Sequence, residues 1–537
     1  MSEPVMNEPT TVRDILRVGL LSDRRGWRLS ASSIGFMTHQ ACEAAVPVLI
    51  GLVIDRAIAT GDGSALLRWL LILGAVFVVL SVSYQAANQG MVRTYSHGEH
   101  DLRQLTAARV LHPRGLASRR RTGDVLTVTT SDTYRVAGVA WSIAEQSATL
   151  AAVVVASGVL LTISIPLGLG VFLGAGVVLW LMQSLARPLE RLGMREQTSV
   201  AAASEVAADT FAGIRTIQGL GAEAESVRRY RAASAASRRG AVASGRSLLT
   251  YQSVSTAVSI LYLAILTGAA GVMALNGTIT IGQLITVVGL AQFLQGSLQH
   301  IGTFGANWAH KRASAKRLHA LVVDEYALPD GVTVPAERTR TLLVWAPRTG
   351  PELRVEEGRM TGVRVTSSQQ ARDLSARLSY RTPIPRGELT ARGVDAVDLG
   401  PDVYASLVLA PPHDAMVFSG SLGDNIGGSG PIDDDLVAAC ALDDVVGLIG
   451  LDAPVGEAGR RLSGGQRQRL TLARALHSDA DVVVLDEPTT ALDPVTEQHV
   501  ANGLRRSGRT VVVITSSRAL LDACDHVVDA AVVEVVR

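Results

Sequence analysis

The sequence predicts an α-helical domain of six transmembrane spans followed by an α/β domain. The chain has 537 residues, of which 47% are hydrophobic and only 4% aromatic, so two modules fit better than one soluble domain. Six apolar stretches fill its first three hundred residues, and arginine is concentrated in some of the gaps between them. A β-branched run that ends in two carboxylates follows at residues 482–487.

The apolar stretches set the membrane prediction. A helix needs roughly 20 residues to cross a bilayer. One such stretch alone would be a buried helix of a soluble core, but six with turn-like gaps favour membrane insertion. They lie at residues 29–54, 66–92, 136–163, 167–185, 248–275 and 281–306.

Arginine sets the orientation. It is concentrated at residues 13–28, 93–135 and 187–246, whereas the gaps at 60–63 and 276–278 carry none. By the positive-inside bias, the N-terminus, two long loops and the C-terminal domain are cytoplasmic in a multi-pass protein of the cell membrane. A cleaved signal peptide is not expected, because the first residues are polar and the first apolar stretch is too long. The predicted parts are an N-terminal segment (1–28), a membrane domain (29–320), a linker (321–331) and an α/β domain (332–537).

Two carboxylates mark the first candidate site. Residues 482–485 are apolar and mostly β-branched, which suits a buried parallel strand. Asp486 and Glu487 then fall at its carboxyl end, where the ligands of open α/β sheets collect and where a carboxylate can reach a metal. In isolation, such a pair before a proline would be an ordinary strand-ending turn.

A second candidate site lies just upstream. Ser463, Gly464 and Gly465 stand where a helix begins, so backbone N–H groups and a helix dipole face any anion there. The run LSGGQ at 462–466, then RQRL, LARAL, VVVLDEP and ALD at 491–493, resembles the ATPase domain of the ABC transporter superfamily. The full series at this spacing is very specific.

The resemblance assigns roles and cofactors. It implies ATP and Mg²⁺, with Asp486 organising the metal and Glu487 polarising the attacking water. Ser463, Gly464, Gly465 and Gln466 would grip the γ-phosphate of ATP held by the opposite subunit. Asp493 would belong to the loop that follows.

The phosphate-binding loop is the main departure. Its pattern GxxxxGK[ST] supplies a backbone nest and a lysine for the phosphates. The sequence lacks that pattern, and no lysine follows Lys316. Residues 365–372 stand where the loop belongs, with Ala371 in place of the lysine and Arg372 in place of the magnesium-binding hydroxyl. Weak or unconventional nucleotide binding is expected; Arg364 or Arg372 either replaces part of the missing charge or is a solvated surface residue.

Two further positions depart from the family. His413 occupies the glutamine position of residues 410–426, as a new ligand, a base or a polar surface residue. Ser516 stands where residues 511–528 would carry the switch histidine. These losses fall on the side that holds a subunit's own nucleotide, whereas the signature that serves the partner is intact. A second half-transporter with a complete loop is therefore implied, and Glu487 would be idle.

The membrane domain carries the same resemblance. Residues 46–55 and 277–284 resemble the first helix and the entry to the sixth helix of ABC exporters. Residues 122–132 and 209–217 resemble their intracellular loops. The leading hypothesis is one half of a heterodimeric exporter for a small molecule, peptide or lipid. The alternatives are a non-hydrolysing regulatory or scaffold subunit, a siderophore importer of exporter architecture, and a homodimeric ATPase.

Polar residues within the spans are candidates for the substrate pathway. They form either a polar wall of the cavity or hydrogen bonds that hold helices together, and neither interpretation identifies the cargo. They are His39, Glu43, Glu145, Gln292, Gln295 and Gln299.

Charge and cysteine content exclude other classes. A net charge of +1 argues against nucleic acid as a partner, and the basic run at 119–121 fits a loop beside anionic lipid headgroups. The three cysteines, Cys42, Cys440 and Cys524, show neither pairing nor metal-ligand spacing.

Overall fold

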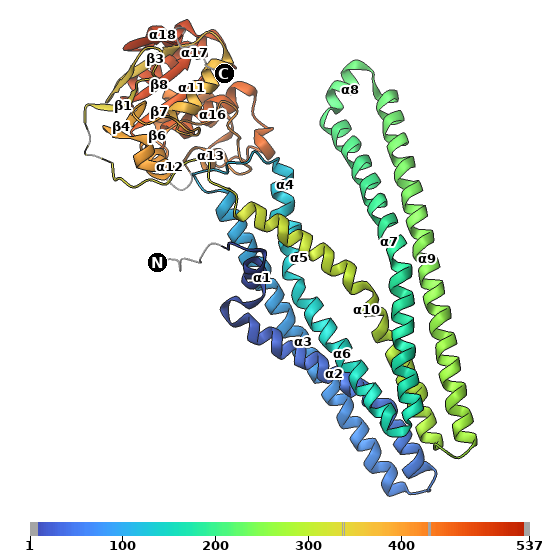
Figure 1. The fold of residues 1–537 in the computed structure, drawn as a ribbon. Coiled ribbons are helices and arrows are strands. Elements are labelled where there is room, and N and C mark those ends of the chain that lie inside the picture. Colours follow the sequence, from blue (N-terminus) through green and yellow to red (C-terminus); the bar gives the residue numbers. More distant parts are fainter. Residues whose placement is uncertain (1–8, 336, 338, 428–430, 531–537) are drawn as a thin grey trace. The chain divides into compact units, whose positions relative to one another are not determined.

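The computed structural model describes residues 9–335, 337, 339–427 and 431–530 (Figure 1). It divides into two compact units. The N-terminal unit contains Met1–Ala107 and Arg121–Val323, and the C-terminal unit contains Ala108–Arg120 and Asp324–Arg537. A short piece from the first half of the sequence thus belongs to the C-terminal unit.

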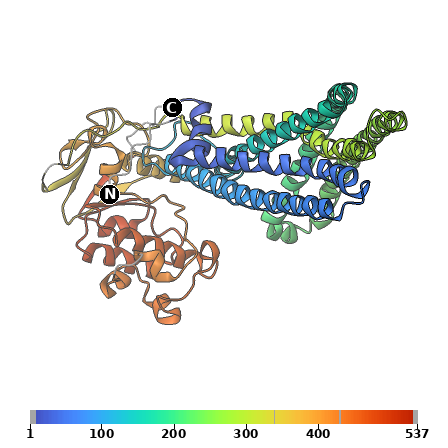
Figure 2. The ribbon, with the colours of Figure 1, turned by 90° about the horizontal axis from the view of Figure 1, so that it is seen from below.

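Helices make up the N-terminal unit. α7 and α9 run side by side along their length and are joined by the short α8 (Figures 1 and 2). The elements in chain order are α1 (Val12–Leu21), η1 (Ser22–Arg24), α2 (Arg25–Val53), η2 (Ile54–Ile58), α3 (Gly63–Val110), α4 (Thr122–Thr127), η3 (Val128–Asp132), α5 (Thr133–Ala137), α6 (Val139–Ile163), α7 (Ile165–Ala212), α8 (Ile214–Leu220), α9 (Glu223–Leu275) and α10 (Ile281–Val322).

All six predicted spans lie on these helices. Within the described residues, three helical segments are long and apolar enough to cross a membrane by length and composition: Gly63–Val110, Thr122–Ile163 and Glu223–Leu275. Only 6% of the most apolar window of α3 is buried inside the protein. Such exposure is costly in water but suits a lipid environment, which supports the predicted helical membrane domain.

The two segments that resemble the ends of exporter helices meet at the contact between α2 and α10. Asp55 accepts hydrogen bonds from the Gly282 backbone N–H at 2.9 Å and from the Thr280 hydroxyl. Gly51 faces the same turn of α10, and a Cβ added there would lie 2.2 Å from Thr286 Oγ1 and 2.4 Å from Gly282 O. The glycine therefore permits close approach of the two helices.

Gly51→Ala is expected to destabilise the membrane unit, because the new methyl group meets backbone and must push α10 away. Overpacking of this kind costs about 1–3 kcal/mol. The measurement is the temperature at which half of the detergent-purified protein loses its monodisperse peak. Gly74→Ala on α3 is the matched control, since nothing lies within 4 Å of its added Cβ. Equal midpoints for the two variants would contradict the prediction.

The C-terminal unit is built around two sheets. The five-stranded sheet is parallel, in the order β6-β7-β8-β3-β9, and the four-stranded sheet is antiparallel, in the order β2-β1-β4-β5. The strands are β1 (Thr341–Trp345), β2 (Leu353–Glu356), β3 (Met360–Arg364), β4 (Leu389–Ala391), β5 (Val394–Asp395), β6 (Val408–Leu409), β7 (Val482–Asp486), β8 (Val511–Thr515) and β9 (His526–Asp529).

Helices cover the parallel sheet, whose strands β7 and β8 are buried along their whole length (Figure 1). The helical elements are α11 (Ser368–Leu378), α12 (Ala396–Leu407), α13 (Leu422–Gly427), α14 (Asp434–Ala439), α15 (Asp443–Ile449), η4 (Glu457–Gly459), α16 (Gly464–Leu476), α17 (Pro494–Arg506) and α18 (Arg518–Ala523). The fully apolar strand predicted at residues 482–485 is confirmed, because a parallel strand is covered on both faces.

A backbone pairing joins residues 114–117 of the first intracellular loop to residues 325–328, which the sequence places in the linker. We call it the loop–linker pairing. Ala117 N donates to Glu325 O at 2.8 Å, Ala327 N to Gly115 O at 3.1 Å, and Leu328 N to Arg114 O at 3.1 Å.

Side chains reinforce the loop–linker pairing. The Tyr326 ring lies 3.5 Å from the Arg109 guanidinium carbon and 4.1 Å from that of Arg114, a cation–π arrangement on one ring. Asp324 accepts from Ser118 and from Arg120 Nε at 3.1 Å.

Candidate functional site

Asp486 and Glu487 lie at the carboxyl end of β7, as the sequence predicts. Their exposed fractions are only 8% and 6%. Burial raises the pKa of the Asp486 carboxyl, while the neighbouring His413 acts in the opposite direction. The two carboxylates thus occupy the edge of the parallel sheet where ligands of such folds bind.

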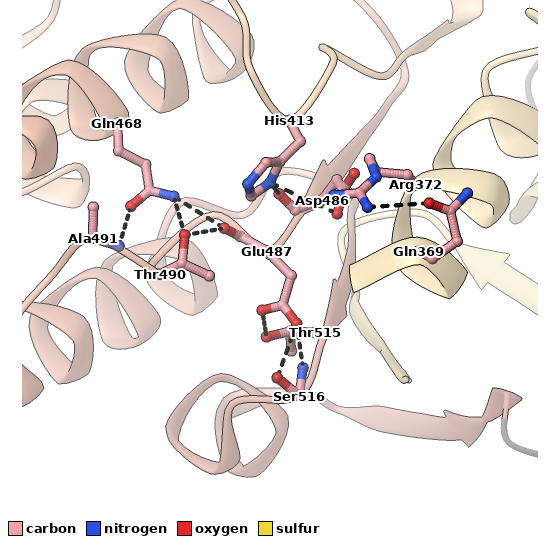
Figure 3. A network of polar contacts seen from close by, with 10 residues as sticks. All are labelled: Gln369, Arg372, His413, Gln468, Asp486, Glu487, Thr490, Ala491, Thr515 and Ser516. Carbon is pink, nitrogen blue, oxygen red and sulfur yellow. Dashed lines mark hydrogen bonds and ion pairs between the residues drawn. The ribbon is translucent and has the colours of Figure 1, made fainter. Parts of the chain in front are cut away.

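The Glu487 side chain points away from His413, towards the end of β8 (Figure 3). Its Oε2 accepts from Thr515 Oγ1 at 2.9 Å, and its Oε1 accepts from Ser516 N at 3.0 Å and Ser516 Oγ at 2.9 Å. Its backbone is left-handed, with φ of 46°, an uncommon conformation for a residue with a side chain. We call these three hydrogen bonds the Glu487 latch.

The Glu487 latch shows what Ser516 contacts. The sequence marks this residue only as the replacement of a histidine, but the structure places its hydroxyl and backbone N–H on the Glu487 carboxylate. Thr515 was missed by the sequence analysis. Thr515 ends an apolar strand, and its contact with Glu487 can be recognised only once β8 is known to pair with β7.

His413 reaches the same edge from the turn after β6. Its Nδ1 lies 3.2 Å from the Asp486 carbonyl oxygen and 4.0 Å from Asp486 Oδ1, and its side chain is one-third exposed. His413, which stands at the family's glutamine position, therefore reaches Asp486. Whether its role is that of a ligand, a base or a surface residue stays a prediction.

The segment at residues 365–372 is mostly helical. α11 begins at Ser368, so only residues 365–367 lie between β3 and the helix, and the rest of the expected loop is wound into its first turns. Ala371 is fully buried in that helix. Ala371 and Arg372 thus lie on the helix, as expected for a segment without glycines, and weak or unconventional nucleotide binding here stays a prediction.

The backbone donors at this helix start already have partners. Ser367 caps α11 by accepting from Gln370 N at 3.2 Å, and Thr366 N donates to Gln370 Oε1 at 3.0 Å. In a phosphate-binding loop, such N–H groups face the anion. Here the protein's own side chains take that place.

The signature helix α16 has the start that the sequence predicts. Ser463 and Gln466 form a capping box, with Ser463 N donating to Gln466 Oε1 at 2.8 Å and Gln466 N donating to Ser463 Oγ at 3.2 Å. Ser463 and Gly464 are exposed. Gly465 is required by packing, since an added Cβ would lie 2.9 Å from Ala491 O.

Gln468, which sequence reasoning missed, links the signature helix to the carboxylate pair. Its Nε2 donates to Glu487 O at 3.0 Å and to Thr490 Oγ1 at 3.1 Å, and its Oε1 accepts from Ala491 N at 2.9 Å (Figure 3). Asp493 caps the next helix, α17, by accepting from Val495 N and Thr496 N. Gln468 of the signature helix thus holds the backbone of the turn that follows the carboxylate pair.

The candidate pathway residues of the membrane unit are only partly brought together. His39 Nδ1 lies 3.0 Å from Leu80 O on α3, and His39 Nε2 lies 3.8 Å from Glu43 Oε2. Glu145 on α6 and Gln292 on α10 are exposed. The side chains of Gln295 and Gln299 lie outside the described residues. The contact between His39 and α3 suits interhelical hydrogen bonding, and a role in the substrate pathway stays a prediction.

Known families match both parts of the chain. The family described as ABC transporter transmembrane region matches residues 29–298, and the family described as ABC transporter matches residues 405–490. The second match contains the signature and the carboxylate pair. It leaves out residues 365–372, the segment that lacks the phosphate-loop pattern.

Curated relatives extend the match. An ATP-dependent lipid A-core flippase of Thiobacillus denitrificans is 25% identical over 94% of this chain and 91% of its own length. The flippase of Xanthomonas euvesicatoria is 29% identical over 66% of this chain and 64% of its own length. A multidrug efflux ATP-binding/permease protein of Mycobacterium tuberculosis is 26% identical over 90% of this chain, but this covers only 42% of the relative.

A solved structure, described as a bacterial Atm1-family ABC exporter with ATP bound, shares the fold with a TM-score of 0.73 at 21% identity, over 94% of both chains. The predicted fold class is confirmed: a helical transmembrane domain followed by an α/β ATP-binding domain. The chain therefore belongs to the ABC transporter family, as a half-transporter of the cell membrane with its ATP-binding domain in the cytoplasm.

Proposed function

We propose that this chain is one half of a heterodimeric ABC exporter and that its signature, residues 463–466, completes an ATP site whose phosphate loop belongs to a different half-transporter. The observation that carries the proposal is an asymmetry within one domain. The signature helix starts with exposed, small residues, whereas the segment that would hold this chain's own phosphates has neither glycine nor lysine and is helical from Ser368 onwards.

The hydrogen bonds of Glu487 also support the proposal that hydrolysis takes place at the partner's site. A general base must lie within hydrogen-bond reach of the water it activates. The Glu487 carboxylate is instead buried and held by three donors in the latch. Hydrolysis then takes place at the partner's site, and this chain contributes the residues that close that site.

The cargo that we propose is an amphipathic molecule, either a lipid or a lipid-like small molecule. Two kinds of relative support this choice, since one is named for lipid A-core and the other for multidrug efflux. Outward transport follows from the same relatives. In this proposal residues 29–320 form the translocation domain and residues 332–537 the ATP-binding domain.

The test compares ATP hydrolysis by the purified chain alone with hydrolysis by the chain co-purified with a half-transporter that has an intact GxxGxGK[ST] loop. The chain alone is expected to hydrolyse ATP no faster than its own Glu487→Gln variant. The pair is expected to be active, and Glu487→Gln in this chain should change its turnover by no more than about twofold, since an idle base contributes nothing to the barrier.

Two results would contradict the proposal. Hydrolysis by the chain alone that Glu487→Gln abolishes would show a working homodimer. A pair that assembles but hydrolyses no ATP would make this chain a scaffold or regulatory subunit.

A further inference from the structure

The surroundings of Asp486 do not suit the metal that the family implies. Mg²⁺ requires near-octahedral oxygen ligands and usually keeps several waters. The family's magnesium-binding hydroxyl is replaced here by the cationic Arg372, and the imidazole of His413 stands at the family's glutamine position. The residues present therefore do not fit Mg²⁺.

The position of Arg372 is set by where α11 begins. Because α11 begins at Ser368, Arg372 lies in its second turn and projects towards the end of β7 (Figure 3). Its Nη2 donates to Gln369 Oε1 at 3.1 Å, and its positive charge acts on the Asp486 carboxyl, whose pKa burial raises and this charge lowers, without a direct ion pair between the two side chains. Gln369 and Arg372 are both exposed, so neither side chain packs into the core.

A second arginine adds to the positive charge. Arg381, from the turn after α11, donates from Nη2 to Ala410 O at 2.5 Å, and its charge also acts on Asp486. His413 approaches Asp486 from the opposite segment. The imidazole of His413 and the charges of two arginines thus act on a carboxylate at which the family would gather oxygen ligands.

We infer that the Arg372 guanidinium takes the place of Mg²⁺ beside Asp486, so that this chain's own site excludes divalent metal. A guanidinium stays protonated in proteins, so the positive charge is permanent. It balances the buried carboxylate and repels a second cation. Asp486 then faces a fixed positive charge instead of a catalytic metal. The inference rests on the proposed function in taking this chain's own site as the idle one.

The test measures Mn²⁺, a paramagnetic substitute for Mg²⁺, on the purified full-length chain by electron paramagnetic resonance. With or without ATP, the wild type and the Asp486→Asn variant are expected to bind the same amount of Mn²⁺. Arg372→Ser removes the cation and restores a hydroxyl. It should create one Asp486-dependent site per chain that binds Mn²⁺ about tenfold or more tightly than any wild-type site, as expected from removal of a nearby like charge.

Arg377→Ser is the matched control, because Arg377 is another exposed arginine of α11 near its far end. It should leave Mn²⁺ binding at the wild-type level. The double variant Arg372→Ser, Asp486→Asn measures the Mn²⁺ that unrelated surface carboxylates bind, and this background is subtracted from the signal of Arg372→Ser.

Either of two results would overturn the inference: Asp486-dependent Mn²⁺ binding by the wild type, or a folded Arg372→Ser variant that binds no additional Mn²⁺. Both are independent of the partner. A failure of the heterodimer proposal, seen as hydrolysis by the chain alone, is therefore distinguishable from a failure of this one.

Discussion

Replacing Ser463 with arginine in the assembled pair is expected to lower ATP turnover by about a hundredfold or more, the loss typical of removing one preorganised anion-stabilising donor. Ser463 is the exposed cap of α16, whose first N–H groups and dipole are directed at the γ-phosphate in the proposed composite site. A long side chain at this position fills the space of the phosphate. The measurement is steady-state ATP hydrolysis by the co-purified pair.

The control is Ser463→Asn, because asparagine is as good a helix cap as serine while remaining short. Its turnover should stay within about tenfold of the wild type if the cap is all that it disturbs. Size-exclusion chromatography must show that both variants still assemble with the partner. Unchanged turnover in Ser463→Arg would mean that this chain does not complete the working site.

The second large effect concerns the Glu487 latch. Thr515→Val combined with Ser516→Ala removes both side-chain donors from a buried carboxylate. Hydrogen bonds to charged groups contribute about 1.5–3 kcal/mol each, so the C-terminal unit should lose about 3 kcal/mol or more of its unfolding free energy. The measurement is the shift in the midpoint of denaturant unfolding, followed by the fluorescence of Trp345, a buried residue of that unit, in a background where the other five tryptophans are replaced by phenylalanine.

A double-mutant cycle separates the latch from other losses, since Thr515 Oγ1 also accepts from Ser517 N at 3.0 Å. In a Glu487→Ala background the same pair of substitutions should cost only about 1 kcal/mol, the net value of an ordinary hydrogen bond. Equal costs in both backgrounds would show that Thr515 and Ser516 do not act through Glu487.

The parts of this site that were predictable from sequence are those set by local patterns. An apolar, β-branched run predicts a buried strand, so Asp486 and Glu487 were placed correctly at its end. Small residues before a helical pattern predict a helix start, which Ser463 provides. The transmembrane helices follow equally directly, because bilayer thickness sets the minimum length of each apolar stretch.

The parts that were not predictable depend on contacts between distant segments. The latch joins Glu487 to Ser516 only because β7 and β8 are neighbours in the sheet. The start of α11 at Ser368 was also not predicted. The family resemblance indicated a phosphate-binding loop at this position, but the segment has no glycines. Once those are gone, the Gln, Ala and Arg of this segment favour a helix. The long helices α7 and α9, of 48 and 53 residues, extend well beyond their predicted spans.

The loop–linker pairing determines where this polypeptide can be divided. A fragment of residues 332–537, cut at the boundary that the sequence suggests, lacks both paired segments. A fragment that starts at Asp324 keeps one strand of the pair but exposes its backbone donors and the Tyr326 ring, because residues 108–120 remain with the other piece. Unpaired strand edges of this kind promote aggregation. An ATP-binding fragment that starts at Asp324 therefore needs residues 108–120 joined to it, through a designed connection or as a bound peptide.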